Sequence, residues 1–302
     1  MAPAIKNVSL TGPQITGNVG APALRALVES RFNVTVLARK QPDELPTGVV
    51  VKLVDFGSVE SLTEALKGQD ALVDAINTPG STEVAQHLID AAVAAGVYRV
   101  IPSEFSGDPN NTILRALPPF VTKTQVLNHL KKKTEGTETT WTTISNNAFL
   151  DWGMRLSFLN IDLKNKKVTR MYDGNHVFEW TLLETVGKAI AGALKKPGET
   201  ENRNCYIHSI KKSQNQMAKL AKEALGGEWQ VEQGDTKKSY EDAMASLQSG
   251  KVDFQVVGDI IRYGVVTPEI GKPFPTNDNE LLGVPTMSDN EVKELLKQIA
   301  SE

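Results

Sequence analysis

The sequence predicts an α/β protein built on a doubly wound parallel sheet, with a smaller α+β region at its C-terminal end. Over the first 150 residues, short β-branched runs alternate with amphipathic segments, the pattern of parallel strands joined by crossover helices. A chain of 302 residues with 40% hydrophobic side chains is long enough to bury a sizeable core. We expect a first domain over residues 1–155 and a cap over residues 156–302, packed on the first domain and partly interleaved with it.

Each element follows from a local pattern. Strands are expected where β-branched residues cluster, at 8–10, 33–38, 49–54, 71–76, 99–101 and 141–144. Helices are expected at 21–29, 59–67, 83–95 and 118–133, the last opened by two prolines and closed by three lysines. The cap region gives weaker patterns, for strands at 168–172 and 177–179 and for helices at 183–194, 214–225, 240–249 and 289–299. The stretch 260–285 has little periodicity.

Composition excludes several classes of protein. The net charge of −3 carries no concentrated basic patch, so we expect no nucleic-acid partner. No apolar run approaches the roughly 18 residues of a membrane span, and the N-terminus lacks the form of a signal peptide. The single cysteine, Cys205, cannot form an intramolecular disulfide. We therefore expect a cytoplasmic protein without membrane contact, as a monomer or a homodimer.

A glycine-containing turn joins the first predicted strand to the first helix. Its two parts are Leu10-Thr11-Gly12 and Gly17-Asn18-Val19-Gly20. Glycines at this place let the backbone turn tightly and approach a pyrophosphate, which then lies on the free N–H groups of the helix. The position predicts a Rossmann-type dinucleotide site formed by Gly12, Thr16, Gly17, Asn18, Val19 and Gly20; a plain strand-to-helix turn is the alternative. With Pro13-Gln14-Ile15 where one residue is usual, the loop is two residues longer than in most such proteins.

The end of the second predicted strand indicates which dinucleotide is bound. NAD-specific sites place an acidic residue here, which accepts hydrogen bonds from the ribose 2′-OH. This chain has Arg39 and Lys40 instead. A guanidinium can bind a 2′-phosphate with two parallel hydrogen bonds, so NADP(H) is favoured over NAD(H).

One lysine lies on an apolar helix face. Lys123 shares this face with Val126, Leu127 and Leu130. Its side chain either extends to solvent or loses hydration, and a desolvated lysine has a lowered pKa suited to proton transfer.

Other catalytic and metal-binding patterns are missing. The chain has no Tyr-x-x-x-Lys pair, so the catalytic dyad of common short-chain dehydrogenases is missing. His87, His129 and His176 lack ligand spacing, and we expect no metal site.

Four segments resemble the isoflavone reductase-like and NmrA-like family. Residues 100–108, Val-Ile-Pro-Ser-Glu-Phe-Ser-Gly-Asp, are similar to its Pro-Ser-Glu-Phe-Gly segment, and 120–126 to the segment that carries its catalytic lysine. Residues 142–149 resemble the family strand whose Asn and Phe lie beside the nicotinamide, and 278–283 resemble the ending of fungal NmrA-like members. Ser106 separates Phe105 from Gly107, whereas plant enzymes have glycine directly after the phenylalanine, so this chain is more similar to fungal members.

The resemblance implies that NADPH delivers a hydride to a conjugated or benzylic carbon of an aromatic small molecule, in secondary metabolism, with Lys123 as general acid or base. It places Ser103, Glu104 and Phe105 at the junction of coenzyme and substrate, and Asn147 and Phe149 near the nicotinamide. We also expect Asn77 and Lys123 among the coenzyme contacts, and Glu104, Phe105, Trp152 and Tyr172 among the substrate contacts.

Two other functions remain open at this point. A redox-sensing regulator of the NmrA type would bind the dinucleotide without turnover, and Lys123 at the matching position favours the enzyme instead. A dehydrogenase or epimerase that uses the tyrosine dyad is disfavoured by the missing motif.

Overall fold

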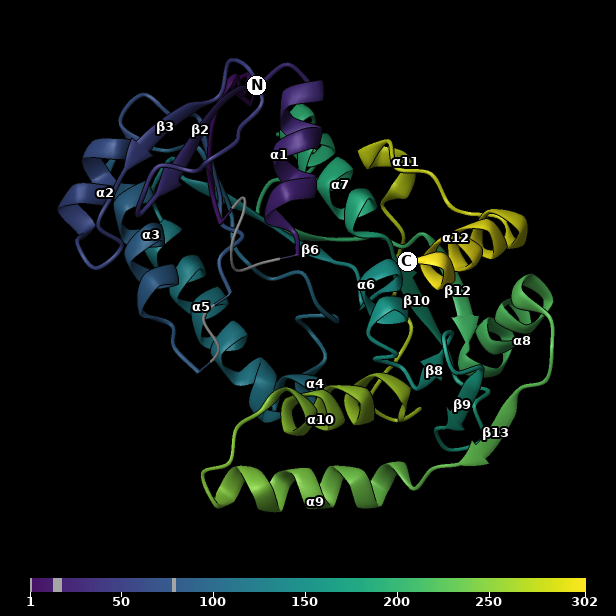
Figure 1. Ribbon diagram of the computed structural model, residues 1–302. Coiled ribbons are helices and arrows are strands. Elements are labelled where there is room, and N and C mark those ends of the chain that lie inside the picture. The colour runs from purple at the N-terminus through teal and green to yellow at the C-terminus, as the bar shows by residue number, and fades with distance from the viewer. Residues whose placement is uncertain (1, 13–17, 78–79) are drawn as a thin grey trace.

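The computed structural model describes residues 2–12, 18–77 and 80–302 (Figure 1). Within these ranges, seven strands pair in parallel to form the central sheet. Their spatial order is β11 (Arg203–Tyr206), β6 (Thr140–Ser145), β5 (Arg99–Ile101), β4 (Ala71–Val73), β1 (Asn7–Thr11), β2 (Asn33–Ala38) and β3 (Val50–Leu53). The chain runs outward from β1 to β3 and then crosses back to β4, so the direction of winding reverses between β1 and β4. A crevice at the carboxyl ends of the strands forms at such a reversal.

Helices cover both faces of this sheet. One face carries α1 (Gly20–Glu29) and α7 (Leu183–Lys195), and the other carries α2 (Val59–Leu66), α3 (Glu83–Ala94) and α5 (Pro118–Thr134) (Figure 1). The faces have separate apolar cores, because strand residues point alternately to each side. α1 and α7 approach closely at Gly187, where a Cβ atom would clash with the backbone of Pro22. The doubly wound parallel sheet predicted from the sequence is confirmed.

The chain after residue 155 contributes both to the central layer and to a separate region. α7 and β11 belong to the central layer, as helix cover and as edge strand. Two three-stranded sheets stand apart from it within the described residues: β12 (Ile210–Ser213), β10 (Val177–Thr181) and β7 (Ala148–Phe149), and β13 (Gln230–Gln233), β9 (Lys167–Arg170) and β8 (Ile161–Asp162). The helices of this region are α6 (Leu150–Arg155), α8 (Gln214–Leu225), α9 (Thr236–Gln248), α10 (Phe254–Val266) and α12 (Asp289–Ser301), whereas the short α11 (Asn279–Leu282) packs against α7. The division at residue 155 stays a prediction.

The structure differs from the predicted elements in several places. For the stretch 260–285, which has little periodicity, no element was predicted, and its start belongs to α10, which begins at Phe254 behind the N-cap Asp253. Its buried residues lie all round the helix, so no single apolar stripe marks it. The strand expected at 71–76 ends at Val73, because Asp74 accepts a hydrogen bond from the backbone N–H of Ile76 and turns the chain. The short α4 (Thr112–Arg115) was also not predicted.

Candidate functional site

The predicted site residues follow the carboxyl ends of five strands. Gly12 comes after β1, Arg39 after β2, Asn77 after β4, Ser103 after β5 and Asn147 after β6. The registers align these ends: Thr11 pairs with Leu37, Leu10 with Val73, and Val73 with Ile101. Segments far apart in the sequence therefore meet at one edge of the sheet, which is where α/β proteins bind ligands.

Of the glycine turn, the structure describes Gly12 and residues 18–20. Gly12 has φ +70°, and a Cβ there would stand 2.8 Å from the carbonyl oxygen of Ala75, so any side chain would collide with the end of β4. Thr16 and Gly17, both predicted to bind the coenzyme, lie outside the described residues, as does the longer loop segment 13–15. Asn18 is exposed and Val19 is the N-cap of α1, with Gly20 as its first residue.

The first turn of α1 is suited to an anion. Its N-cap residue Val19 makes no side-chain cap, and no acidic residue lies in its first turn. Within the described residues, the N–H groups at the start of α1 and the positive end of the helix dipole thus suit a pyrophosphate. This fits a dinucleotide.

Arg39 and Lys40 are exposed immediately after β2. Across residues 2–12, 18–77 and 80–302, neither side chain takes part in an ion pair. Two cations beside the glycine turn are therefore free to meet a phosphate.

Lys123 does not extend to solvent. Its Nζ donates to the backbone carbonyls of Ser103 at 2.9 Å and Glu104 at 2.8 Å. Of the two alternatives that periodicity left open, the structure shows the desolvated one. Burial lowers the pKa of Lys123, the carboxylates of Glu104 and Asp74 oppose that change, and the Arg115 guanidinium adds to it.

The position of Lys123 follows from the packing of α5. Phe120 is buried against α10 and α4, whereas Leu127 and Leu130 are buried against the sheet and α3. Lys123 lies between these two anchors along the helix and faces the turn after β5. The three lysines at the C-terminal end of α5 sit in its last turn, as predicted.

Glu104 and Phe105 are more buried than their predicted substrate contacts suggest. Glu104 is 2% exposed and its carboxylate pairs with Arg115. Phe105 is 7% exposed, packs into the core on the α1 side, and has the unusual φ of +24°. Their contact with substrate stays a prediction, while the carbonyl of Glu104 has a defined partner in Lys123.

Asn147 is held by a buried carboxylate. With φ +52°, it donates its side-chain amide to Glu179 Oε2 at 3.2 Å. Glu179 is fully buried and also accepts from the N–H of Phe274 and from Lys211. The neighbouring Asn146 is fully buried as well, and its Oδ1 has no hydrogen-bond partner in the described part of the chain. These groups fit the recognition of a polar ligand at the end of β6.

Aromatic side chains continue from Phe149. Trp152 lies edge-on to it, with ring centroids 6.4 Å apart, and also contacts Phe158 and Phe254. Tyr172 contacts Thr267 through its hydroxyl, in the C-terminal region, and no contact in the described chain joins it to Lys123. Trp180 is completely buried against Phe178 and belongs to the core.

Sequence reasoning missed Asp74, Arg115 and Glu179. Asp74 is 4% exposed and accepts from Thr11 Oγ1 at 2.7 Å, and burial raises its pKa. A lone acid directly after a buried apolar strand is a signal that could have identified it. Arg115 and Glu179 lie in segments without any such signal.

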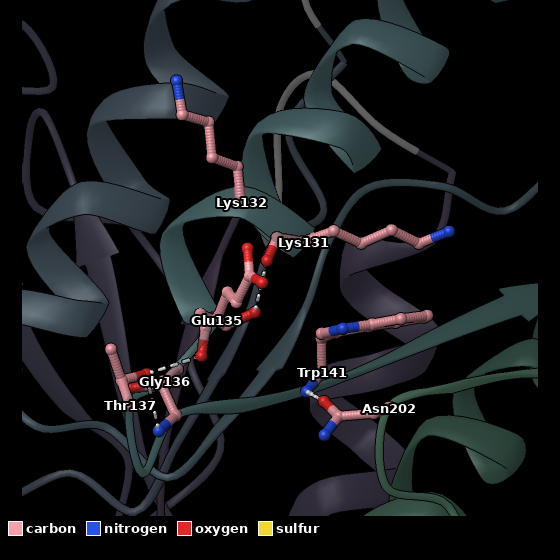
Figure 2. A pocket seen from close by; sticks show the side chains of 9 residues that line it. Lys131, Lys132, Glu135, Gly136, Thr137, Trp141 and Asn202 are labelled. Atoms are coloured by element: carbon pink, nitrogen blue, oxygen red, sulfur yellow. Dashed lines mark hydrogen bonds between the residues drawn. The ribbon is translucent and has the colours of Figure 1, made fainter.

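A hollow of about 450 Å³ lies elsewhere, between the end of α5 and the start of β6. Figure 2 shows Lys131 extended alongside the ring of Trp141, with Asn202 next to it. Because β6 begins at Thr140, this hollow is at the amino edge of the sheet. It is open to solvent and lies away from Lys123, so we do not assign it to the site.

Three of the four histidines, those considered as metal ligands, have ordinary structural partners. His87 contacts the carbonyl of Phe56, His129 contacts Asp90, and His176 contacts the carbonyl of Gly271. Among the described residues, no three His, Cys, Asp or Glu side chains gather as a metal site would require. Nor does any helix in those residues have the length and hydropathy to cross a membrane.

Comparison with known proteins gives a consistent result. The NAD(P)H-binding family model matches residues 15–196. "Oxidoreductase aprR" of Aspergillus flavus is 31% identical over 285 residues, covering 91% of this chain and 94% of the relative. "Oxidoreductase poxI" of Penicillium oxalicum is 28% identical over 295 residues, covering 94% and 92%.

Solved structures share the fold. The crystal structures of pinoresinol-lariciresinol and phenylcoumaran benzylic ether reductases match with a TM-score of 0.79 at 20% identity, covering 97% of this chain and 99% of the other. A structure described as AtPrR2 with NADP+ and (+)pinoresinol matches with a TM-score of 0.71 at 19% identity, covering 99% and 100%.

Proposed function

This chain belongs to the NAD(P)H-binding family and is similar over most of its length to a fungal oxidoreductase. From that premise we propose that it is an isoflavone reductase-like enzyme, which uses NADPH to reduce an aromatic or conjugated small molecule. Hydride goes to a conjugated or benzylic carbon, and Lys123 is the general acid or base. The observation that carries the proposal is the position of Lys123 Nζ, bound to two carbonyls at the sheet edge that holds the glycine turn.

The two carbonyls fix the direction in which Lys123 exchanges its proton. An ammonium has three N–H groups, and two of them donate to Ser103 and Glu104. A neutral amine keeps both donors and presents its lone pair in the third tetrahedral direction. The group can therefore take a proton from a phenol, or return one to an enolate, without losing either hydrogen bond. Its lowered pKa makes the neutral form accessible at lower pH than for a free lysine.

The coenzyme supplies the hydride, and the chain binds and orients it. The backbone at Gly12 and the free N–H groups at the start of α1 bind the pyrophosphate. Arg39 and Lys40 bind the 2′-phosphate, which selects NADPH over NADH. Asn147, held by Glu179, binds a polar group near the nicotinamide. Asn77, exposed after β4, and Ser103 line the same edge.

The part of the chain after residue 155 that lies outside the central layer, together with α6, forms the substrate cap. Phe149 and Trp152, whose rings meet edge to face, supply aromatic surface, and rings of this kind pack favourably against an aryl substrate. The solved structure of AtPrR2 with NADP+ and (+)pinoresinol, a protein of the same fold, supports an aromatic substrate for this chain. The naming of two fungal relatives as oxidoreductases favours the enzyme over a dinucleotide-sensing regulator.

The test is a panel of aryl enones, quinone methides and benzylic ethers, followed by the loss of NADPH absorbance. We expect at least one class to be reduced, and Lys123→Ala to abolish that reduction while NADPH affinity stays near the wild-type value. Lys132→Ala is the matched control, since Lys132 is exposed on the same helix. NADPH binding without oxidation of the coenzyme on any member of the panel would contradict the proposal and support the regulator. Undiminished turnover in Lys123→Ala would remove the acid/base assignment.

A further inference from the structure

A buried ion pair adjoins the two carbonyls that hold Lys123. Arg115, in α4, donates Nη2 to Glu104 Oε1 at 2.5 Å, and the two side chains are only 5% and 3% exposed. Ser106 Oγ donates to the same carboxylate oxygen at 2.7 Å. Through this one oxygen, Glu104 links the turn after β5 to Arg115 in α4, eleven residues further along the chain.

The turn held by this pair has a strained backbone. The N–H of Glu104 donates to the carbonyl of Pro102 at 2.7 Å, and Phe105 has φ +24°. A bulky residue keeps such a conformation only where its surroundings impose it. The result of the conformation is that two successive carbonyls, those of Ser103 and Glu104, both accept from Lys123.

One N–H donor group of this ion pair lacks a hydrogen-bond partner among the described residues. Within the described chain, Arg115 Nη1 is buried and has no hydrogen-bond partner. A buried donor without a partner costs stability. In native proteins such a group calls for an explanation, and a role in a functional site is one.

We propose that the Glu104–Arg115 ion pair positions Lys123: it locks the strained turn whose carbonyls bind Nζ, and it sets a charge of each sign beside that amine. Arg115 and Glu104 are thus positioning residues for the proton transfer, acting through Lys123. The inference rests on the proposed role of Lys123.

Three charged groups in the described chain act on Lys123. Glu104 comes from the turn after β5, Arg115 from α4 and Asp74 from the end of β4. Glu104 and Asp74 raise the pKa of Lys123 and Arg115 lowers it, against a larger lowering by burial. Removal of Glu104 or of Arg115 should therefore move the titration of Lys123 in opposite directions.

The experiment measures the titration of Lys123 without any substrate. The full chain is labelled with trace acetic anhydride over a pH series, and the Lys123 peptide is quantified by mass spectrometry against exposed Lys132. We expect Glu104→Gln to shift the Lys123 midpoint to lower pH. We expect Glu104→Gln/Arg115→Met to bring it part of the way back, since the remaining positive charge is gone. Arg115→Met alone leaves a buried carboxylate unpaired and is expected to fold poorly. The double variant, in which both side chains are neutral, is therefore measured in its place.

Asp90→Asn is the matched control. It removes the carboxylate that contacts His129 and Lys133, both on α5 as Lys123 is, and leaves the turn after β5 intact. Its Lys123 titration should coincide with that of the wild type. A pair with a purely structural role would lower the unfolding temperature in both Glu104 variants but leave the Lys123 midpoint unchanged, and this outcome would overturn the inference. Failure of the proposed function appears separately, as reduction that persists in Lys123→Ala.

Discussion

Gly12 lies directly against Ala75: a Cβ atom on Gly12 would stand 2.8 Å from the Ala75 carbonyl oxygen. The contact joins the ends of β1 and β4, the two strands between which the winding of the sheet reverses. It is reinforced by Thr11 Oγ1, which accepts from the N–H of Ala75 and donates to Asp74. The glycine turn is therefore part of the packing of the crevice as well as a surface for phosphate.

Gly12→Ala should both destabilise the protein and weaken NADPH binding. The alanine must adopt φ +70°, at about 1–2 kcal/mol, and also displace the end of β4, at about a further 1–3 kcal/mol. Gly136→Ala is the control, because Gly136 has φ +73° but nothing within 4 Å of its Cβ position. Thermal unfolding with and without NADPH measures both effects. Equal destabilisation of the two variants would mean that the contact with Ala75 is unimportant.

Arg39→Ala should weaken the binding of NADPH and leave that of NADH nearly unchanged. The guanidinium is exposed beside the turn, so its loss removes about 1.5–3 kcal/mol of charge-assisted hydrogen bonding to the 2′-phosphate. Fluorescence titration with both coenzymes provides the measurement, and Arg25→Ala on α1 serves as a control of equal charge. An equal loss for NADPH and NADH would assign Arg39 to some other part of the coenzyme.

The reduction should depend on the protonation of Lys123. Burial lowers its pKa, so the neutral amine is present at lower pH than for an exposed lysine. If Lys123 is the general base, kcat/KM rises with pH and levels off above that lowered pKa; if it is the acid, activity falls there instead. Lys123→Arg should lose the dependence together with the activity, because a guanidinium does not deprotonate. A profile that is identical in the variant would assign the titration to another group.

Glu179→Gln should loosen Asn147 and destabilise the protein. Both carboxylate oxygens of Glu179 accept hydrogen bonds, and a glutamine amide turns one of these positions into a donor. We expect a loss of about 1–3 kcal/mol in the free energy of unfolding and weaker NADPH binding. Glu184→Gln, which breaks an exposed pair with Lys188, is the control. Chemical denaturation and coenzyme titration measure the two effects. An unchanged NADPH affinity would mean that Asn147 does not contact the coenzyme.

Cys205 should resist alkylation in the native protein. The side chain is fully buried in β11, and burial, with the nearby carboxylate of Asp278, raises the pKa of its thiol to about 12. At pH 8 almost no thiolate forms, and access is blocked. Iodoacetamide followed by mass spectrometry should label the denatured chain and leave the native chain unlabelled. Stoichiometric labelling under native conditions would show that the edge strand β11 opens.

Local patterns were sufficient for the sheet but not for the cap. Most strands and helices of the first 150 residues were predicted nearly to their ends, the exceptions being β4 and the short α4, because most have a clear period and a recognisable turn beside them. In the cap, β12 and β13 are short and polar, and α10 is buried on several sides, so the period is weak or lost. The return of β11 to the edge of the central sheet depends on pairing with β6, some 60 residues earlier.

By itself the sequence determined the doubly wound sheet, the glycine turn at the end of its first strand, the cations after its second, and the lysine on the helix that follows the prolines. These are local features, since backbone geometry and side-chain period decide them within one or two turns of chain. Only the tertiary structure decided what surrounds that lysine. The carbonyls of Ser103 and Glu104, the charge of Arg115 and the carboxylate of Asp74 reach Lys123 from separate elements. Desolvation and electrostatic interaction depend on distances between groups in space, and the periodicity of the sequence does not specify distances between separate elements.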